Sequence, residues 1–383
     1  MTAQFSRLGA VIFVCRDKSM KVKLGDVCER GTSNLRQSDV VGKGGDYPIY
    51  GASGYIGDVD FYHQEKSYVA IVKDGAGIGR TMLCPEKSSV IGTMQYLLPK
   101  EAILPQYLYY VVKYMHLEKY FSGATIPHIY FKDYKNEQFN LDTLKKQAII
   151  VKILGKCEEV IAARNKQLNA LDELIQARFV ELFGEPILNP KEWKIVTIGD
   201  IALDVRYGTS RPAVEGGKYP YLRMNNLTID GHLDLTDLKY IDIPEEELEK
   251  CVVRKGDILF NRTNSLELVG KTAVFDLCED MVIAGYIIRV RLNNKMILPE
   301  IFSQYMNHKT LKKILRGMAK GAVNQANINA KELQSIKIYV PNMKLQDEFV
   351  TFVNQVHKSK VEIQQALEKT QLLFDSLMQQ YFG

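Results

Sequence analysis

The chain lacks the residue patterns of most metal sites and catalytic centres. Its six cysteines are scattered and include no Cys-x-x-Cys pair, and its six histidines form no His-Glu-x-x-His motif. We therefore expect no metal site, no disulfide framework and a reducing, cytoplasmic environment. No phosphate-binding loop that ends in Lys-Ser or Lys-Thr is present, and no serine, histidine and aspartate set emerges. These absences argue against a self-contained enzyme.

Long apolar runs are missing as well. The run Leu8–Cys15 is too short to span a bilayer, and no small-residue cleavage site follows it. We expect neither a membrane partner nor a signal peptide, and we interpret residues 1–20 as a dispensable extension. Asn189-Pro190 precedes Lys-Glu and not the aromatic residue that an amino-methylating site would stack on its target base.

The chain does contain one long amphipathic segment twice. Leu144–Gly184 and Met343–Gly383 align without a gap, and both end in Phe-Gly. Eight of ten positions on an alternating four-three spacing are apolar in each copy, which is typical of a coiled-coil seam. The apolar seam positions are Ile150, Leu154, Cys157, Ile161, Leu168, Leu171, Ile175 and Leu182, then Phe349, Val353, Val356, Ile363, Leu367, Phe374, Leu377 and Tyr381. Polar residues interrupt the seams at Arg164, Arg178, Lys360 and Thr370.

The repeat extends to the segment before each helix. Leu24-Gly25-Asp26-Val27 and Ile198-Gly199-Asp200-Ile201 open the two segments, and a Tyr-Pro pair follows in each. Leu104-Pro105 and Leu298-Pro299 then introduce two helical segments, residues 107–120, which are rich in tyrosine, and residues 301–316. Runs of β-branched and aromatic residues between these points predict strands. They cover residues 67–73, 95–98, 257–261, 272–275 and 286–292.

These patterns predict an α+β fold with a tandem, pseudo-twofold plan. Two mixed, mostly β bodies (residues 21–142 and 185–341) alternate with two long antiparallel coiled-coil helices (143–184 and 342–383), each of which would reach roughly 60 Å. The net charge of +5 lies on the bodies, at +3 in each, while the helical stretches are nearly neutral. Positive bodies favour contact with phosphate, as expected for readers of two DNA half-sites at a fixed spacing. A coiled coil that only dimerises the chain remains an alternative.

Polar side chains crowd the predicted loops of the second body. Arg can bridge guanine, Asn can bridge adenine, and Ser or Thr can contact phosphate or a base edge. The candidates for DNA contact are Tyr207, Thr209, Ser210, Arg223, Asn225, Asn261, Arg262, Thr263, Asn264, Lys271, Asn324 and Asn327. Among them, Arg223, Asn225, Asn261, Arg262 and Asn264 are the predicted base readers. Ordinary turn formation would explain any one of these residues but less readily the whole group.

The first body carries a different set of candidates. They are Ser53, Tyr55, Lys73, Arg80, Thr125 and His128. The glycine-rich loop between Lys73 and Arg80 resembles a cofactor loop, but the strand-like residues 81–84 follow it where a nucleotide loop would open a helix. We therefore interpret it as a tight loop that brings backbone and two cations close to a ligand.

The second body and the paired helices together resemble the DNA-specificity subunit of type I restriction–modification systems. The most specific motif is Gly256–Ser265 followed by Val269-Gly270-Lys271, and the similarity covers residues 21–383. The resemblance implies that each body reads one half of a split DNA target. It also implies that the helices set the gap and dock two modification (methyltransferase) subunits.

The same resemblance implies that this chain has no active site and holds no cofactor. S-adenosylmethionine would act in the modification subunits, and ATP and Mg²⁺ in restriction subunits that join the complete enzyme. The duplex would be bound in the bacterial cytoplasm, at the nucleoid. Arg223-Met224-Asn225 stands near the place of Tyr50-Gly51-Ala52 in the other body, which suggests two unlike half-sites. Two alternatives remain: a single-chain DNA methyltransferase or nuclease, and a coiled-coil scaffold with no DNA role.

Overall fold

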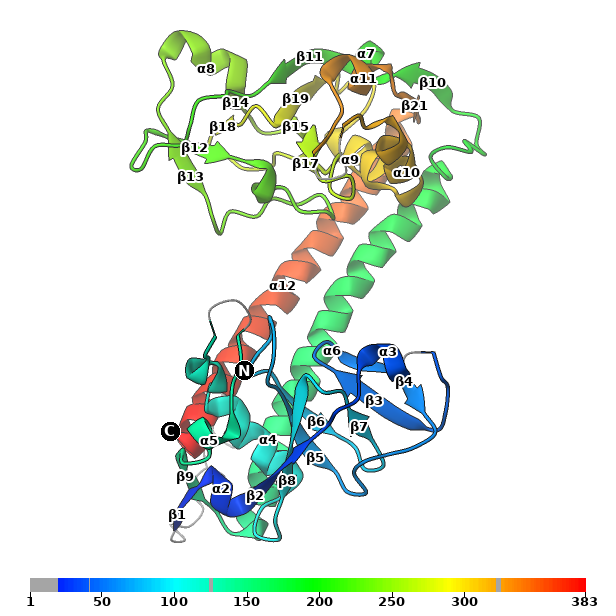
Figure 1. Cartoon of the computed structure of the whole chain (residues 1–383). Helices are drawn as coiled ribbons and strands as arrows, with labels where there is room; N and C mark the ends of the chain where they lie inside the picture. Colours follow the sequence, from blue (N-terminus) through cyan, green and yellow to red (C-terminus); the bar gives the residue numbers. More distant parts are fainter. Residues whose placement is uncertain (1–19, 41, 124–126, 322–324) are drawn as a thin grey trace, which may run out of the picture. The chain divides into compact units, whose positions relative to one another are not determined.

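The computed structural model describes residues 20–40, 42–123, 127–321 and 325–383, so residues 1–19 of the predicted extension lie outside it. The chain divides into two compact units. Unit 1 holds the described residues up to Asn165 together with Gln365–Gly383, and unit 2 holds Lys166–Gln364. Each unit therefore combines one body with part of each long helix, α6 (Leu144–Phe183) and α12 (Met343–Phe382) (Figure 1). Within the described residues, no helix is long and apolar enough to cross a membrane.

Unit 1 is built on a four-stranded antiparallel sheet. Its order is β2 (Cys28–Thr32), β8 (Met94–Pro99), β5 (Tyr68–Val72) and β6 (Thr81–Cys84). A second sheet has the order β4 (Gly54–Val59), β3 (Tyr47–Gly51) and β7 (Ser89–Val90), with β3 and β7 parallel. A third sheet pairs β1 (Met20–Lys23) with β9 (Gln138–Leu141). Every residue of β5 is buried, which makes this strand the centre of the body.

Unit 2 repeats this plan with additional short strands. Its central sheet has the order β11 (Ala202–Tyr207), β19 (Ile287–Leu292), β15 (Ile258–Asn261) and β17 (Thr272–Val274). Its second sheet has the order β13 (Lys239–Ile241), β12 (Tyr219–Leu222), β18 (Met281–Ile283) and β14 (Val252–Val253), with β12 and β18 parallel. Two short pairs complete it: β10 (Lys194–Thr197) with β21 (Lys337–Val340), and β16 (Thr263–Asn264) with β20 (Ala326–Asn327). The predicted α+β tandem repeat is confirmed.

Short helices connect the strands. In unit 1 they are α2 (Leu24–Val27), α3 (Gln37–Val40), α4 (Pro105–Tyr114), η1 (Leu117–Tyr120) and α5 (Phe131–Tyr134). In unit 2 they are α7 (Ile198–Ile201), η2 (Met224–Asn226), α8 (Glu245–Cys251), α9 (Pro299–Asn307), α10 (Lys309–Met318) and α11 (Ala330–Ser335).

Two details differ from the sequence prediction. Each of the two predicted helical segments that follow a Leu-Pro pair is broken, at left-handed His116 in unit 1 and at extended His308 in unit 2. His308 ends α9 and caps α10, a dual role that helical periodicity does not reveal. The short helix α7 is followed directly by strand β11, which ends at Tyr207.

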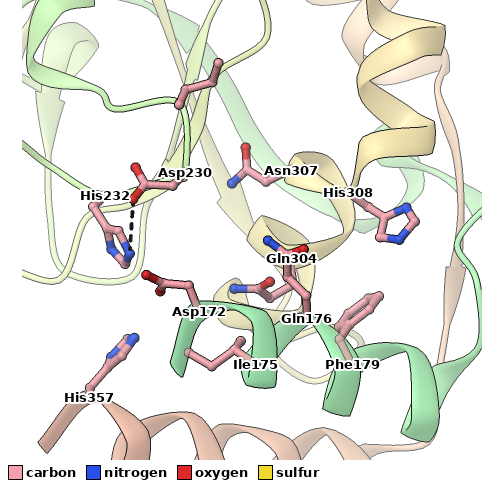
Figure 2. Close-up of a pocket in the computed structure, with 11 residues that line it drawn as sticks. Asp172, Ile175, Gln176, Phe179, Asp230, His232, Gln304, Asn307, His308 and His357 are labelled. Atoms are coloured by element: carbon pink, nitrogen blue, oxygen red, sulfur yellow. Dashed lines mark ion pairs between the residues drawn. The ribbon is translucent and has the colours of Figure 1, made fainter. Parts of the chain in front are cut away.

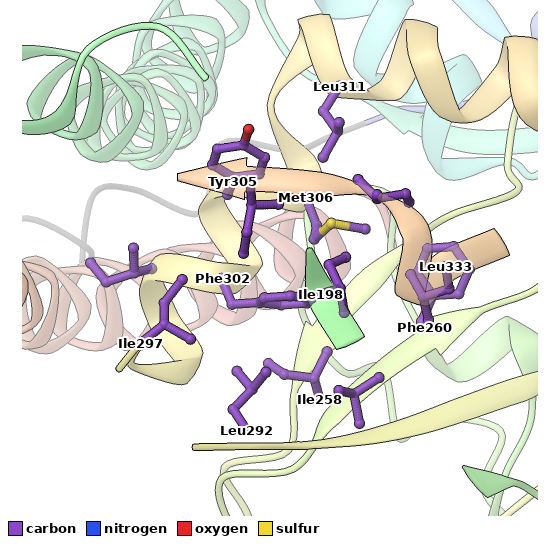
Figure 3. Packing of buried hydrophobic residues seen from close by; sticks show 14 of the residues in the cluster. Ile198, Ile258, Phe260, Leu292, Ile297, Phe302, Tyr305, Met306, Leu311 and Leu333 are labelled. Atoms are coloured by element: carbon purple, nitrogen blue, oxygen red, sulfur yellow. The ribbon is translucent and has the colours of Figure 1, made fainter. Parts of the chain in front are cut away.

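The long helices belong to the cores of the units. In unit 2, Phe179 and Phe183 of α6 and Phe349 of α12 pack edge-on against one another and join the cluster that holds Phe260 and Phe302 (Figure 3). In unit 1, the opposite halves meet, with Ile150 and Leu154 of α6 beside Phe374 and Phe382 of α12. Each full burial of such a side chain contributes about 1.5–3 kcal/mol. The predicted antiparallel pairing of the two helices is therefore present inside each unit.

The predicted seams have the correct spacing, but the apolar face of each long helix is wider than the predicted stripe. Phe179, Phe183, Met378 and Phe382 are buried although they lie off the predicted stripe. They are buried because these parts of the helices pack against the body as well as against each other, which widens the apolar face.

The polar interruptions of the seams pair across the two helices. Arg164 donates to the hydroxyl of Thr370 and to the carbonyl oxygen of Ala366. The Lys360 ammonium lies 2.6 Å from an Asp172 carboxylate oxygen. Paired polar groups within an apolar seam select one register.

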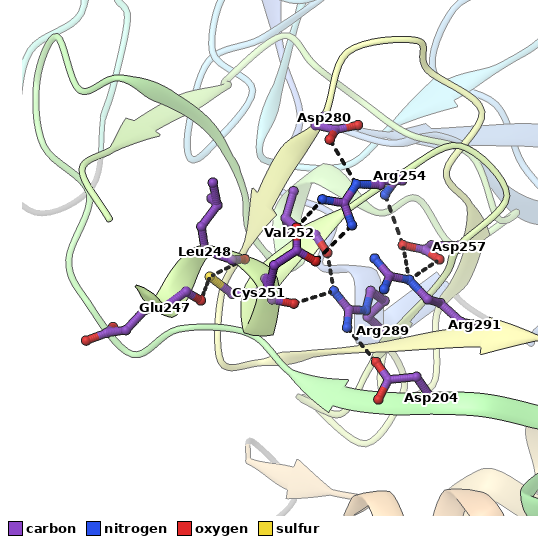
Figure 4. A network of polar contacts seen from close by, with 11 residues as sticks. Asp204, Glu247, Leu248, Cys251, Val252, Arg254, Asp257, Asp280, Arg289 and Arg291 are labelled. Carbon is purple, nitrogen blue, oxygen red and sulfur yellow. Dashed lines mark hydrogen bonds and ion pairs between the residues drawn. The ribbon is translucent and has the colours of Figure 1, made fainter. Parts of the chain in front are cut away.

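A polar network fixes α8 to the central sheet of unit 2 (Figure 4). Arg289 on β19 is almost fully buried, and its guanidinium donates to the Asp204 carboxylate at 2.5 Å and to the carbonyl oxygens of Glu249 and Val252. The buried guanidinium thus has hydrogen-bond acceptors on the sheet side and on the helix side, as a buried cation requires.

Candidate nucleic-acid interface

A basic residue follows the central strand of each body at the same structural position. Lys73 follows β5; its backbone N–H donates to Thr93 and its carbonyl accepts from Ile129 at 2.9 Å. Arg262 follows β15 and makes the equivalent bonds to Tyr286 and Ile328, both at 2.9 Å. The two candidate base-contacting cations are therefore counterparts in the repeat.

The next residue of each loop is tied to a second loop. In unit 1, a carboxylate oxygen of Asp74 lies 2.6 Å from Nδ1 of His128. In unit 2, the Thr263 hydroxyl donates to Oδ1 of Asn327 at 2.9 Å. The segments that end at His128 and Asn327 therefore occupy equivalent places in the two bodies. Thr125 and Asn324, which belong to the same two segments, lie outside the described residues.

A third equivalent contact was not predicted. Arg80 donates from Nη1 to the carbonyl oxygen of Ala52 at 3.0 Å, and Lys271 donates from Nζ to that of Met224 at 2.7 Å. Both cations hold the turn that follows the first strand of the second sheet. The exposed side chains of Ser53 and Asn225 lie on these two turns. Arg80 and Lys271 therefore position other candidates, in addition to any contact of their own.

Glycine is required just before each of these cations. Gly79 and Gly270 have φ values of +81° and +83°, a region that residues with a Cβ rarely adopt. A Cβ on Gly79 would lie 2.6 Å from the Glu118 backbone nitrogen, and one on Gly270 would lie 2.8 Å from Cδ1 of Leu315. The loop at Gly79 therefore packs closely against η1, and the loop at Gly270 packs closely against α10.

Arg262 is oriented by its surroundings in unit 2. Its guanidinium carbon lies 4.8 Å from the ring centre of Tyr207, and Nη1 donates to the Gly285 carbonyl at 3.3 Å. The Tyr207 hydroxyl in turn accepts from the backbone of Ala330 at 2.8 Å. A stacked guanidinium loses less conformational freedom when it binds a base edge.

Asn261, Asn264 and Lys271 have roles inside the loop. Asn261 is fully buried, donates to the carbonyls of Thr263 and Tyr286 at 3.2 Å, and accepts from Asn264 at 2.8 Å. Lys271 is also buried, and burial lowers the pKa of its ammonium. Direct base contact by Asn261 would require the loop to open. The sequence alone does not distinguish these roles, because an Asn amide can satisfy backbone groups as well as a base.

The other unit 2 candidates lie nearer the surface. Arg223 donates to an Asp237 carboxylate oxygen at 2.7 Å, so a base would have to compete with that carboxylate. The Thr209 hydroxyl accepts from the Arg211 backbone at 3.2 Å, and Ser210 is exposed.

Unit 1 presents aromatic side chains that the sequence analysis left out. Tyr130 and Phe121 are 48% and 63% exposed and flank the segment that ends at His128. The rings of His128 and Tyr130 stack, with centroids 6.3 Å apart. Predicted Tyr55 is also exposed, and its hydroxyl donates to Asp58 at 2.5 Å. The available sequence signal for the two unpredicted aromatic residues was their position close to the candidates Thr125 and His128.

A separate cavity of about 270 Å³ lies in unit 2. It is lined by three histidines and two aspartates, including His232, His357 and Asp172 (Figure 2). None of the predicted DNA-contacting side chains lines it. Among the residues that the structure describes, no group of three or more His, Cys, Asp or Glu side chains is placed to hold a metal ion.

Comparison with known proteins identifies one family. The model of the type I restriction modification DNA specificity domain matches the chain twice, over residues 16–173 and 190–372. The MjaX specificity subunit of a type I restriction enzyme from Methanocaldococcus jannaschii is 30% identical over 168 residues, which are 43% of this chain and 39% of that protein. The type I restriction enzyme EcoKI specificity subunit of Escherichia coli is 29% identical over 43% of this chain and 36% of its own length. The match thus spans well under half of these two relatives.

A longer match and two solved structures agree with this result. The MjaVIII specificity subunit from Methanocaldococcus jannaschii is 24% identical over 79% of this chain and 76% of its own length. The S subunit of a type I restriction–modification system from M. genitalium shares the fold, with a TM-score of 0.58 over 97% of this chain and 98% of that one at 16% identity. A chain from a structure on complex assembly and conformational transition of the type I R-M system has a TM-score of 0.54 over 96% and 98% of the two chains, also at 16% identity. These matches favour neither the single-chain enzyme nor the scaffold without a DNA role.

Proposed function

Because this chain belongs to the type I restriction–modification DNA specificity family, we propose that it is the subunit that reads the DNA target of such a system. Unit 1 would contact one half of a split sequence, and unit 2 would contact the other. Its partner is then double-stranded DNA, and the chain itself carries out no chemical step.

One observation carries this proposal. The two bodies hold the same loops with the same backbone contacts but present different side chains. Lys73 takes the place of Arg262, and the Asp74–His128 pair takes the place of Thr263–Asn327. A shared scaffold with unlike contact groups fits the recognition of two unlike half-sites, since base edges are distinguished by the donors and acceptors that face them.

The long helices would set the spacing of the half-sites and dock two modification subunits. Exposed large apolar side chains on α6 and α12 support this part of the proposal. A single exposed leucine is common on any protein, but several on one pair of helices indicate a surface that binds another protein. They are Ile149, Leu174, Val361, Leu372 and Leu373, all about half exposed or more. S-adenosylmethionine would be bound by the modification subunits. ATP and Mg²⁺ would be used by restriction subunits that join the complex.

The test compares Arg262→Ala with Lys73→Ala in the full chain, co-produced with its modification subunits. Sequencing of methylated positions in host DNA would show the target of each complex. We expect Arg262→Ala to relax one half-site and Lys73→Ala the other, since a good base contact contributes about 1–3 kcal/mol of discrimination.

Equal relaxation of both half-sites by either variant would contradict the assignment of one half-site to each body. Methylation by this chain alone would favour the enzyme alternative. A wild-type complex that prefers no sequence would refute the proposed function itself.

A further inference from the structure

Helix α10 carries four cations on one face. Lys309, Lys312, Lys313 and Arg316 follow the i, i+3, i+4, i+7 spacing, and the opposite face buries Leu311 and Leu315. We call these four residues the α10 basic face. Within the described parts of the chain, no carboxylate oxygen lies within 4.0 Å of their charged groups.

Several other unit 2 lysines also lack a carboxylate oxygen within 4.0 Å among the described residues, so the α10 basic face is distinguished by having four such cations on one helix face. Elsewhere in unit 2, Arg211 pairs with Glu247 at 2.8 Å, and Lys320, just after the helix, pairs with Glu332 at 2.5 Å. In unit 1, η1 occupies the equivalent place, since Gly79 packs on it as Gly270 packs on α10. There Lys119 is neutralised by Glu137 at 2.5 Å. An unpaired face is therefore not a general property of the fold.

The α10 basic face lies against the loop that follows β15. The Lys312 ammonium donates to the Gly270 carbonyl oxygen, and Arg316 donates from Nη2 to that of Glu267 at 3.4 Å. Arg262 begins this same loop. Burial, with Arg316 and Lys271 nearby, lowers the pKa of Lys312 to about 7. The cations of the α10 basic face thus lie beside the loop without a counter-charge, and a bound anion would favour the charged form of Lys312.

We propose that the α10 basic face binds the phosphate backbone of the duplex, next to the half-site that unit 2 reads. This inference rests on the proposed function and adds a site to it. A phosphate backbone fits because it always runs beside the base edges that a recognition loop contacts. An acidic protein surface is the competing partner, but the face belongs to the body and touches the recognition loop. The duplex would then be held more by charge on the unit 2 side than on the unit 1 side.

The test uses the double variant Lys309→Gln/Lys313→Gln, because both side chains are exposed and donate to no group of the loop. The matched control is Lys250→Gln/Lys255→Gln, which removes the same charge from α8 and from the turn after β14 in the same unit. Helix α8 lies away from α10 (Figure 1). Full chain in complex with its modification subunits is titrated with a cognate and a scrambled duplex over a range of salt concentrations. Thermal unfolding of each variant verifies the fold.

We expect the α10 variant to bind both duplexes roughly tenfold or more weakly, and to lower the slope of log affinity against log salt by about two. The methylated sequence and the thermal midpoint should not change, and the control should behave as wild type. An unchanged salt slope would overturn the inference. So would an equal loss in the control, or a loss of assembly with the modification subunits at unchanged DNA affinity. If the wild-type complex failed to distinguish the two duplexes, the proposed function would fail instead.

Discussion

Gln147 in unit 1 and Gln346 in unit 2 make three equivalent hydrogen bonds each. Oε1 of Gln147 accepts from the Leu104 backbone at 2.8 Å, while Nε2 donates to the carbonyls of Ala102 and Asp142. Oε1 of Gln346 accepts from Leu298 at 2.8 Å, and Nε2 donates to Met296 and Pro341. Both side chains are fully buried. Each glutamine therefore ties the first turn of a long helix to the loop that starts a short helix of the body.

Replacing Gln346 by Ala should destabilise unit 2. It would leave one donor and two acceptors of the backbone buried without partners, and we expect a loss of about 3 kcal/mol in the free energy of unfolding. Chemical denaturation followed by far-UV circular dichroism measures the loss. Gln355→Ala on the exposed side of α12 is the control and should change stability little. Equal stability of the two variants would show that the three bonds contribute nothing.

Gly270→Ala should distort the loop that carries Arg262. The positive φ and the 2.8 Å approach of Leu315 Cδ1 act together, so we expect about 2 kcal/mol of destabilisation and a weaker preference in one half-site. Gly256→Ala is the matched control, because Gly256 has φ +93° but no atom within 4 Å of the added Cβ. Its backbone strain alone should cost about 1 kcal/mol. If both variants lost the same stability and kept full specificity, contact with α10 would not shape the loop.

Stability should rise with pH in the neutral to alkaline range because of Lys312. Its folded pKa is about 7, against 10.5 for the unconstrained side chain. Below about pH 7 Lys312 is charged in both the folded and the unfolded protein, so folding bears the full free-energy cost of burying the ammonium group. Above that pH the folded state releases the proton while the unfolded state keeps it, so the free energy of unfolding increases with pH. The increase should be about 1–2 kcal/mol, since water screens the partly exposed amine.

Urea midpoints at about pH 6.5 and about pH 9 measure this rise. Lys312→Met should flatten most of it, with a remainder from Lys271, whose pKa is lowered in the same direction. The exposed neighbour Lys313→Met should keep the full rise. A wild-type midpoint that falls with pH would contradict this prediction.

Repetition made most of the fold readable from the sequence. The 4-3 spacing predicted both long helices, and β-branched runs predicted β5, β15 and β19, because these strands are buried on both faces and tolerate few other residues. The breaks at His116 and His308 escaped prediction because a capping residue is defined by its backbone and not by its type alone.

The candidate site was less readable. Lys73 and Arg262 stand out as cations after buried strands, so the sequence could propose both. Their equivalence depends on backbone bonds to separate segments of the chain, which no local pattern encodes. Asn261 shows the limit most clearly, since the same amide could have faced a base or the backbone, and only packing decided between them.

The division into units has a consequence for biosynthesis. Unit 1 is assembled from two distant stretches of chain, because Leu377, Met378 and Phe382 complete the core around Leu108 and Ile150. On the ribosome, every residue of unit 2 emerges before that core can close. Domains usually acquire their structure in the order of translation; here the unit whose body is translated first lacks part of its core until the last turns of α12 have been made.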